Sequence, residues 1–343
     1  MEEIATVGID LAKSIFHVHA VDKTGQMVLQ KAFKRRSLIA FFQKLSPCLI
    51  GIEACGSAHH WGRTLRQFGH DVRLIPPTYV KPYVRRQKND ATDAAAICEA
   101  VTRPTMRFVP IKTEEQQSAL MLHRARSLLL SQRTALICAI RGHMAELGLI
   151  APRAVRNMQP LLDVLEDGED ESMPPLARDA LRPLAEQLAH IDLQIARLDR
   201  ELLKWHRDNP VSQRLASIPG VGPVTATALA ATVTDPSMFA SAREFSAFLG
   251  LAPRQNSTGG RTKLGRISKM GDRYLRTLLV SGAVSLLSPK RKNTCVLDTW
   301  AKALIAKDKP IKLVAIALAN KMARVAWALM ARGEPFRNPA PAV

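Results

Sequence analysis

Four acidic residues near the start of the chain stand where a carboxylate needs a partner. Asp10 ends the apolar run IATVGID, Glu53 lies in the apolar run CLIGIEACG, and Asp90 and Asp93 are three residues apart in KNDATDAAAIC. Residues three apart share one face of a helix, so the last two can converge with strand-end carboxylates on one point. Gathered carboxylates repel unless a cation neutralises them, and oxygen ligands select Mg²⁺, with Mn²⁺ as the alternative.

Acids gathered around such ions predict phosphoryl transfer, because two ions about 3.5 to 4 Å apart can stabilise both the attacking and the leaving oxygen. Each acid taken alone has a simpler explanation: Asp90 and Asp93 suit the first turn of a helix, and Glu53 suits a turn. That explanation is weak for the set, since Asp10 and Glu53 both interrupt apolar strands. Glu53 or Asp93 is also a candidate to accept the proton that the hydroxyl of an attacking serine would lose.

A second group of residues lies in the stretch GLAPRQNSTGGRTKLGRISKMGDRYLRTLL. Ser257 has no neighbouring His or Asp to form a hydrolase triad, but a hydroxyl can attack phosphorus where cations stabilise the displacement. From spacing alone, an ordinary turn residue or a phosphate donor is the favoured interpretation of Ser257. The cations around it, set against the single acid Asp272, predict a phosphate-contacting surface with steep salt dependence. These cations are Arg254, Arg261, Lys263, Arg266, Lys269, Arg273 and Arg276.

Two weaker patterns have ordinary alternatives. In LASIPGVGPVTATALAATV, Gly220 and Gly222 lie between apolar helical segments, which is similar to the hairpin of a helix-hairpin-helix motif. Glycines there let backbone N–H groups approach a phosphate, although a tight connection between helices would look the same. Cys55, His59 and His60 match no standard zinc spacing, so we expect His59 or His60 on a helix face.

The elements that must position the acids follow from hydrophobic patterning. The runs IATVGID, IFHVHAVD and MVLQKAF predict three consecutive strands, SLIAFFQKLS predicts a helix, and CLIGIEACG and DVRLIPP predict two further strands. Strands mixed with helices give an α/β domain over residues 1–112. The order of strands and acids points to an RNase H-like fold for this domain.

Residues 113–207 predict long coiled-coil helices with a linker at 150–176. In the first helix Leu122, Leu129 and Leu136 recur every seven residues. The second helix carries a longer stripe at spacings of three and four: Leu181, Leu184, Leu188, Ile191, Ile195, Leu198, Leu202 and Trp205. Such a seam suits either a hairpin within one chain or a dimer, and we favour the dimer.

Length and composition limit the class of protein. A chain of 343 residues is long enough for two or three domains, and the excess of 49 Lys and Arg over 30 Asp and Glu favours polyanionic partners, nucleic acid first. We expect a mostly helical domain at 208–333 and a disordered tail at 334–343. The sequence shows no signal peptide, no continuous membrane-spanning run and no disulfide framework among its five cysteines, so we expect a cytoplasmic protein.

Several of these motifs together resemble one family. GIDLAK, GIEACGSAHHW and KNDATDAAAIC resemble the motifs of the DEDD insertion-sequence transposases, the IS110 family, whose N-terminal domain is similar to the RuvC resolvase. IPGVGPVTA, GLAPRQNSTGG and GRISKMGDRYLRTLL are similar to the C-terminal transposase domain of that family, which holds a serine at the position of Ser257. The resemblance covers nearly the whole chain, although Thr258 stands where many relatives have a second serine.

The resemblance implies a recombinase in which Asp10, Glu53, Asp90 and Asp93 bind Mg²⁺ and Ser257 forms a transient covalent link to DNA. It also implies donor and target DNA as partners and a bridge RNA as guide. An even-numbered assembly, a homodimer or homotetramer, would act in the bacterial cytoplasm at the nucleoid. A covalent link is chemically sensible because it keeps the phosphodiester energy that resealing needs.

Two other functions remain as alternatives. A metal-dependent, structure-selective DNA nuclease of the junction-resolving type would use water as its nucleophile and would keep its cleavage activity in Ser257→Ala. A nucleic-acid scaffold would use its acids only structurally and would keep full activity in Asp10→Asn.

Overall fold

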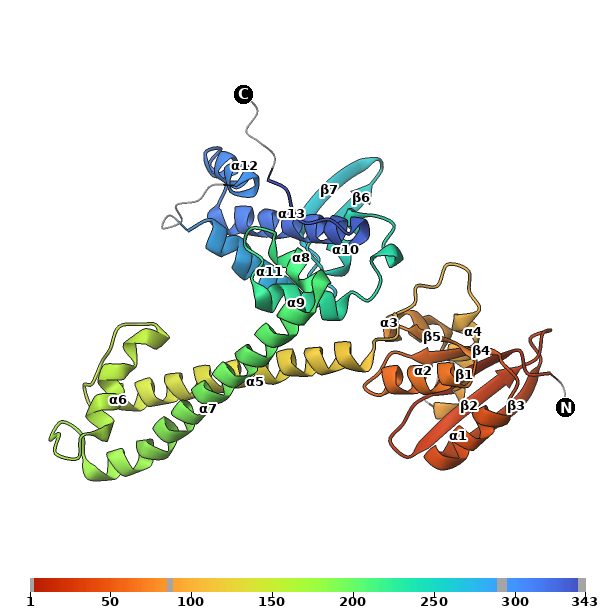
Figure 1. The fold of residues 1–343 in the computed structure, drawn as a ribbon, viewed down its shortest axis with the longest axis horizontal. Helices are drawn as coiled ribbons and strands as arrows, with labels where there is room; N and C mark the ends of the chain where they lie inside the picture. Colours follow the sequence, from red (N-terminus) through yellow and green to blue (C-terminus); the bar gives the residue numbers. More distant parts are fainter. Residues whose placement is uncertain (1–2, 85–88, 289–294, 339–343) are drawn as a thin grey trace. The chain divides into compact units, whose positions relative to one another are not determined.

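The computed structural model describes residues 3–84, 89–288 and 295–338, and the chain divides into two compact units (Figure 1). The first unit is Met1–Glu114 and the second is Glu115–Val343. Each unit has hydrophobic cores of its own.

A five-stranded sheet forms the centre of the first unit. Its strands are β1 (Thr6–Asp10), β2 (Ile15–Val21), β3 (Met27–Lys34), β4 (Leu49–Glu53) and β5 (Asp71–Ile75). The order in the sheet is β3-β2-β1-β4-β5, with β1, β4 and β5 parallel and β2 antiparallel to both of its neighbours. The five strands predicted from hydrophobic patterning are confirmed, and the unit is mixed α/β as expected.

Helices cover both faces of this sheet. They are α1 (Arg35–Lys44), α2 (Ala58–Gln67), α3 (Pro77–Val80), the short 3-10 helix η1 (Lys81–Tyr83) and α4 (Asp90–Val101). On one face, Ile9 of β1 is buried in a core with Phe42 of α1 and Trp61 of α2. On the other face, Ile97 of α4 packs in a separate core with Ile75 of β5. Side chains alternate along a strand, so consecutive residues of β1 contribute to opposite layers.

Two long antiparallel helices begin the second unit. The elements are α5 (Glu114–Glu146), the short 3-10 helix η2 (Val155–Asn157), α6 (Gln159–Glu166) and α7 (Pro175–Asp208). Ion pairs join Arg126 to Asp199 and Arg133 to Asp192, which sets an antiparallel register between α5 and α7. All eight apolar residues of the predicted α7 stripe are buried or half-buried within the chain. The two helices therefore form a hairpin within one chain, and a dimer through them stays a prediction.

The buried stripe of α5 differs from the predicted one. Leu122, Leu129 and Leu136 are only half-buried. The fully buried positions begin three residues earlier, with a gap between the second and the third of them: Ala119, His123, Ile137, Ile140 and Met144. Arg126 and Arg133 continue that stripe and pair with α7, so two of its members are charged. A leucine-based pattern misses a seam whose stability comes partly from ion pairs.

The segment predicted as a linker, 150–176, contains α6. Leu161 and Leu165 lie four residues apart on that helix and pack with Met158 and Met173 in the core at the far end of the hairpin. One apolar face on a short helix is enough to dock it, although prolines and acids dominate the composition of the segment.

The rest of the second unit is a helical module with one β-hairpin. Its elements are α8 (Pro210–Ala216), α9 (Pro223–Thr232), the 3-10 helix η3 (Pro236–Met238), α10 (Ala242–Phe248), β6 (Pro253–Thr258), β7 (Arg261–Ile267), α11 (Arg273–Leu286), α12 (Val296–Ile305) and α13 (Ile311–Arg332). Within the described ranges, α13 alone is long and apolar enough to span a membrane. Its residues Val314, Leu318 and Met322 are buried in the core of the module, so here it is a core helix.

The predicted disordered tail, 334–343, is held in place over part of its length. The Phe336 backbone N–H donates to Ser217 Oγ at 2.8 Å, and Asn338 Oδ1 accepts from the Val296 N–H at 3.1 Å. The Phe336 side chain also packs on the core, which explains why this part is docked. Residues 339–343 lie outside the described residues.

Candidate functional site

Two adjacent parallel strands end in almost the same tripeptide. β1 ends in Gly-Ile-Asp and β4 ends in Gly-Ile-Glu. The parallel register pairs Gly8 with Gly51, so Asp10 and Glu53 occupy equivalent places at the carboxyl ends of neighbouring strands. The central isoleucines face one core, which leaves each glycine and each acid on the opposite face of the sheet, where α4 lies.

The glycines let α4 pack very close to the sheet. A Cβ atom on Gly8 would lie 2.2 Å from the Ala94 carbonyl oxygen and 2.4 Å from the Cys98 nitrogen. A Cβ atom on Gly51 would lie 2.8 Å from Val101 Cβ. Side chains at these positions would force the helix away from the strands. The glycines two residues before the acids therefore let α4 lie close to those acids.

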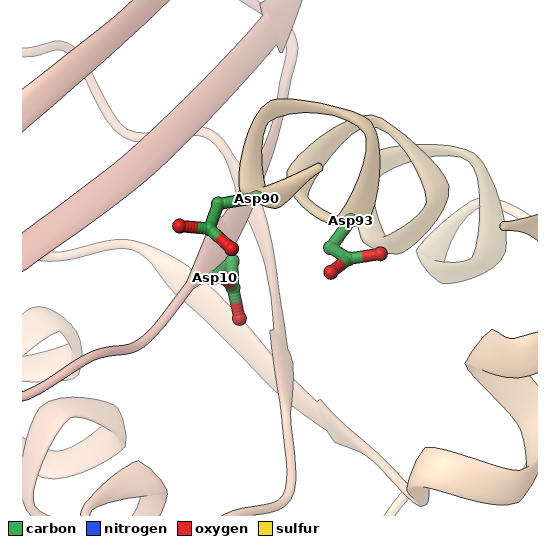
Figure 2. Close-up of side chains that lie close together, drawn as sticks. All are labelled: Asp10, Asp90 and Asp93. Carbon is green, nitrogen blue, oxygen red and sulfur yellow. The ribbon is translucent and has the colours of Figure 1, made fainter. Parts of the chain in front are cut away.

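Three carboxylates converge at the N-terminus of α4 (Figure 2). The helix starts at Asp90, and the side chain of Asn89 caps it by accepting the Ala91 N–H at 3.0 Å. Asp10, Asp90 and Asp93 each offer one oxygen, and these three oxygens all lie within 4.8 Å of one another. Asp10 and Asp93 are half-buried and Asp90 is exposed. The structure therefore brings together three of the four predicted acids.

Glu53 lies outside this group of three but is close enough for the charges of the group to shift its pKa. Burial raises the pKa of the Glu53 carboxyl above its usual range, and the charges of Asp10 and Asp93 raise this pKa further. Glu53 therefore flanks the three-acid group and favours its protonated form more than an exposed glutamate does.

A histidine that the sequence analysis did not single out also reaches the cluster. The antiparallel pairing of β1 with β2 places His17 opposite Asp10, and His17 Nε2 lies 3.6 Å from Asp90 Oδ2. In IFHVHAVD the histidines alternate with buried apolar residues, so His17 had to lie on the same face of the sheet as the acids. That alternation was the signal that could have identified it.

The chemistry of the donor set fits a hard divalent cation. Three carboxylate oxygens within 4.8 Å repel one another, and a cation between them would remove that repulsion. By contrast, Cys55, His59 and His60 belong to no metal-binding group within the part of the chain that the structure describes. His59 and His60 lie on α2, as expected, and His59 Nδ1 accepts the Lys112 N–H at 3.2 Å.

Ser257 lies in a strand of a β-hairpin and is not the turn residue that its spacing favoured. It is the fifth residue of β6 and pairs with Thr262 of β7. Gly259 and Gly260 form the two-residue turn with φ of +54° and +76°, as a type I′ turn requires. The Gly-Gly pair between Ser-Thr and Arg-Thr is a hairpin signal, so the sequence did contain this information.

The hairpin, residues 253–267, is a cationic ribbon that is exposed to solvent. Every residue of β6 is exposed, and in β7 only Ile267 is partly covered. The ribbon carries four of the predicted phosphate-contacting cations and has no acidic residue: these cations are Arg254, Arg261, Lys263 and Arg266. Gln255 Nε2 donates to Ser257 Oγ at 2.9 Å. A two-stranded hairpin without a third strand or a cover is marginally stable alone, so its surface is available to a ligand.

The base of the ribbon is tightly anchored. The Lys269 N–H donates to the Gly250 carbonyl at 3.1 Å, and Arg276 Nη1 donates to the Leu249 carbonyl at 2.8 Å. Arg276 is half-buried by this contact, whereas Lys269 and Arg273 are exposed. Asp272, the single acid of the segment, caps α11 by accepting the Leu275 N–H at 2.9 Å. The acid is therefore explained by helix capping, which leaves the cations around the ribbon unopposed.

The two glycines of the predicted helix-hairpin-helix element differ in their surroundings. They lie in the connection between α8 and α9. Gly220 has φ of +83°, and a Cβ there would lie 2.8 Å from Leu286 Cδ1 and 2.9 Å from the Gly282 carbonyl oxygen. Gly222 is exposed and has open space around it at the start of α9. Packing on α11 explains Gly220, and phosphate binding at this connection stays a prediction.

Comparison with known families matches both halves of the chain. A model of DEDD transposases of the IS110 type, described as a transposase family, matches residues 7–148, which contain the four acids. A model described as the transposase IS116/IS110/IS902 family matches residues 212–295, which contain Ser257.

Relatives resemble the chain over almost its whole length. The transposase for insertion sequence element IS1328 of Yersinia enterocolitica is 38% identical over 336 residues, which cover 98% of this chain and 99% of the relative. The transposase for insertion sequence element IS1111A of Coxiella burnetii is 39% identical over 337 residues, 98% of this chain and 92% of the relative. A protein of Pseudomonas aeruginosa described as a "Probable family 20 transposase" is 45% identical over 335 residues, 97% and 99%.

Proposed function

Because this chain belongs to the IS110 family of insertion-sequence transposases, enzymes that cut and rejoin DNA, we propose that it acts through a phosphoserine link between Ser257 and DNA. Mg²⁺ at the acidic cluster and a bridge RNA complete the proposed machinery. The observation that carries the proposal is the convergence of Asp10, Asp90 and Asp93 within 4.8 Å in the part of the chain that the DEDD model matches.

We assign metal binding to Asp10, Asp90 and Asp93, with Glu53 as a further ligand at their flank. The strand order of the first unit supports an RNase H-like, RuvC-like assignment for this domain, with two of its acids at the ends of β1 and β4. A bound Mg²⁺ would stabilise the negative charge that develops on the oxygens of the phosphate, and Mn²⁺ could replace it. The close packing of α4 on Gly8 holds the carboxylates in place before substrate arrives.

The proposed covalent step transfers a phosphoryl group from DNA to the protein. Ser257 Oγ forms a bond to phosphorus, and the bond from phosphorus to the deoxyribose oxygen of the leaving strand breaks. The serine hydroxyl loses its proton to a base, and the leaving oxygen gains a proton. The reverse reaction with a different DNA hydroxyl reseals the backbone, so no external energy source is needed. Lysines and arginines of the ribbon stabilise the charge of the displacement.

We propose that the ribbon cations contact the phosphates of donor and target DNA. Arg254, Arg261, Lys263 and Arg266 are all exposed on the ribbon, and Lys269 and Arg273 continue the charge toward α11. Contacts of this kind position DNA without reading its sequence. Sequence selection would then come from base pairing with the bridge RNA, which the excess positive charge of +19 would help to bind.

We further propose that an even number of chains, a homodimer or homotetramer, carries out the reaction in the bacterial cytoplasm at the nucleoid. Exposed apolar residues on the helical hairpin support such an assembly. Met121 and Leu128 of α5 are 62% and 59% exposed, and Leu193 of α7 is 68% exposed. Apolar side chains on the outside of a hairpin offer contacts to a second copy.

The decisive experiment is detection of the covalent intermediate. Purified protein is incubated with Mg²⁺, transcripts of the flanking RNA, and labelled donor and target DNA, and the products are resolved under denaturing conditions. We expect a protein–DNA adduct that is absent in Ser257→Ala and retained in the neighbouring Thr258→Ala control. Cleavage without any adduct, unchanged in Ser257→Ala, would show that the protein is a nuclease that uses water. Full activity in Asp10→Asn would leave only a scaffold role for the acids.

A further inference from the structure

A groove of about 1030 Å³ lies between α13 and the base of the ribbon. Several separate segments line it, and their residues include Pro253, Gly265 and Ile267 of the ribbon, Trp300 of α12, and Ile316 and Trp327 of α13. This volume is at the upper end of the range for small-molecule pockets, so the groove has room for more than one nucleotide. Among its lining residues only Arg266 and Lys269 belong to the proposed phosphate-contacting surface of the ribbon.

The charge of the groove is of one sign. Five cations line it, while no carboxylate does so among the described residues: Arg266, Lys269, Lys321, Arg324 and Arg332. None of the ion pairs found in the described ranges engages these five side chains. Burial lowers the pKa of Lys321, and the neighbouring Arg324 lowers it further. An anionic ligand would relieve the repulsion between these cations.

The groove also offers aromatic surfaces in a rigid frame. Trp327 Nε1 donates to the Pro236 carbonyl at 3.0 Å, which fixes the ring of this tryptophan. Lys321 Nζ lies 4.4 Å from the centre of the Trp300 ring, a cation–π contact. Leu313 at the groove remains 54% exposed. Cations combined with flat aromatic and apolar walls match a ligand that carries both phosphates and planar bases.

The ribbon connects this groove to Ser257. Pro253 and Ser257 are both on β6, four residues apart, so they are separated by about 13 Å and lie on the same face of the ribbon. Between the pairs Pro253–Ile267 and Gln255–Leu264, β7 has one residue more than β6. Such a bulge redirects side chains, and here Arg266 lines the groove. A strand whose phosphate lies at Ser257 can therefore continue along this face into the groove.

We propose that the groove binds an unpaired segment of the DNA strand that Ser257 attacks, with bases against Trp300 and the neighbouring apolar wall and phosphates against Arg324 and Lys321. This inference rests on the proposed role of Ser257 and adds a specificity for unpaired DNA. Paired bases inside a duplex are already stacked and cannot offer their faces to tryptophan. Strand exchange must expose unpaired nucleotides, because each released strand has to leave its old partner before it pairs with a new one.

The test separates binding from chemistry. In a full-length Ser257→Ala background, fluorescence anisotropy measures the Kd of a labelled single-stranded oligodeoxynucleotide, of the matching duplex and of single-stranded RNA of the same sequence. We expect the single-stranded DNA to bind more tightly than the other two. Trp300→Leu, which keeps apolar bulk, should weaken that binding about 10-fold, the loss expected for one base stack. Arg324→Gln should weaken it several-fold and lower the salt slope by about 1.

A matched control and a mapping experiment complete the design. Lys312→Gln removes the same charge from an exposed position of α13 outside the groove and should change the Kd less than 2-fold. Photocrosslinking with 5-iododeoxyuridine should recover the peptide that contains Trp300. Circular dichroism checks that Trp300→Leu folds, and exposed Arg324 provides a variant that leaves the core untouched.

Three outcomes would overturn the inference: unchanged binding in both Trp300→Leu and Arg324→Gln, equal or tighter binding of RNA, or equal binding of duplex DNA. Because the background lacks the nucleophile, none of these outcomes depends on adduct formation. Adducts formed at the parental rate by both groove variants would reject the groove and leave Ser257 as the nucleophile. Tight binding of single-stranded DNA by the parental chain, which keeps Ser257, without any adduct formation would reject the link to Ser257.

Discussion

The acidic cluster and the ribbon carry the two halves of the proposed chemistry. The surrounding structure holds these two regions in place to very different degrees. The cluster is built on a sheet covered on both faces, and α4 is held so close to β1 that a Cβ on Gly8 would lie 2.2 Å from the Ala94 carbonyl oxygen. The ribbon has no cover at all along β6. One region has its groups placed by packing before any ligand arrives, and the other offers its groups to solvent.

This difference is consistent with what each region is proposed to bind. Carboxylates around a cation must be held close together against their own repulsion, and only a packed core can do this. A nucleophile that must meet a long polyanion needs access and positive charge more than burial. The comparison predicts that substitutions at the cluster act through geometry and folding, whereas substitutions on the ribbon act mainly through binding.

The largest effect on activity is expected when one carboxylate of the cluster is lost. Asp10→Asn or Asp93→Asn should lower the rate of DNA cleavage and joining at least about 10³-fold, because each removes a charged ligand from a group of three. Glu53→Gln should cost less, since Glu53 flanks the group. Without metal, Asp93→Asn should melt at or above the temperature of the parent protein, because carboxylate repulsion is relieved.

The metal readout makes this prediction sharp. Mg²⁺ or Mn²⁺ should raise the melting temperature of the parent protein and should raise it much less in Asp93→Asn. Differential scanning fluorimetry measures the melting temperatures. An equal metal-induced rise of the melting temperature in both proteins would show that the acidic cluster does not bind the metal.

The next effect tests whether packing places the cluster. Gly8→Ala should lower the unfolding free energy of the first unit by about 3 kcal/mol or more, because the added methyl group would overlap backbone atoms of α4. Gly56→Ala is the matched control: a Cβ there meets nothing within 4 Å, and the residue does not have a positive φ. Urea unfolding followed by circular dichroism measures both. A stable, metal-binding Gly8→Ala protein would refute this role of the glycine.

A pH effect of similar size should appear in the second unit. His123 of α5 is buried between Tyr274, whose hydroxyl is 2.9 Å from Nδ1, and Thr227, whose Oγ1 is 3.0 Å from Nε2. Burial, with a smaller contribution from the charge of Arg126, lowers the pKa of His123 from 6.5 to about 4. The unfolded chain therefore binds a proton at a higher pH than the folded chain.

Stability of the second unit should accordingly fall as the pH falls from about 6.5 to about 4, by about 3 kcal/mol from this residue. His123→Gln, which cannot titrate, should show a smaller fall over the same range. Calorimetric melts at several pH values measure the difference between the two proteins. Identical pH profiles would show that His123 is not buried in its neutral form.

The smallest effect belongs to single ribbon cations. Arg261→Gln should leave the melting temperature unchanged within experimental error, because Arg261 is exposed beside the turn. It should weaken DNA binding only several-fold and reduce the slope of log Kd against log salt by about 0.9, the change expected for one lost phosphate contact. Anisotropy titrations at several salt concentrations give this slope. A large loss of stability would contradict the description of the ribbon as an uncovered element.

The accuracy of sequence-based prediction differed between these two regions for a physical reason. Alternation of apolar residues identified all five strands, since burial of one face of a strand leaves a period of two in the sequence. The ribbon has no buried face, so apolar alternation could not reveal it, and only the turn chemistry of Gly259 and Gly260 pointed to a hairpin. The seam of α5 was misplaced because Arg126 and Arg133 continue it as ion-paired residues.

Residue types and spacing alone established which groups could do chemistry: carboxylates interrupting apolar strands, a serine among cations, and motifs of one transposase family. They also determined the α/β character of the first unit and the long helices of the second. Only the tertiary structure decided which acids converge, how close His17 lies to Asp90, how closely α4 packs on Gly8, and that a tryptophan-lined groove adjoins the ribbon. Such facts depend on distances between residues far apart in the chain, and local periodicity carries no information about those distances.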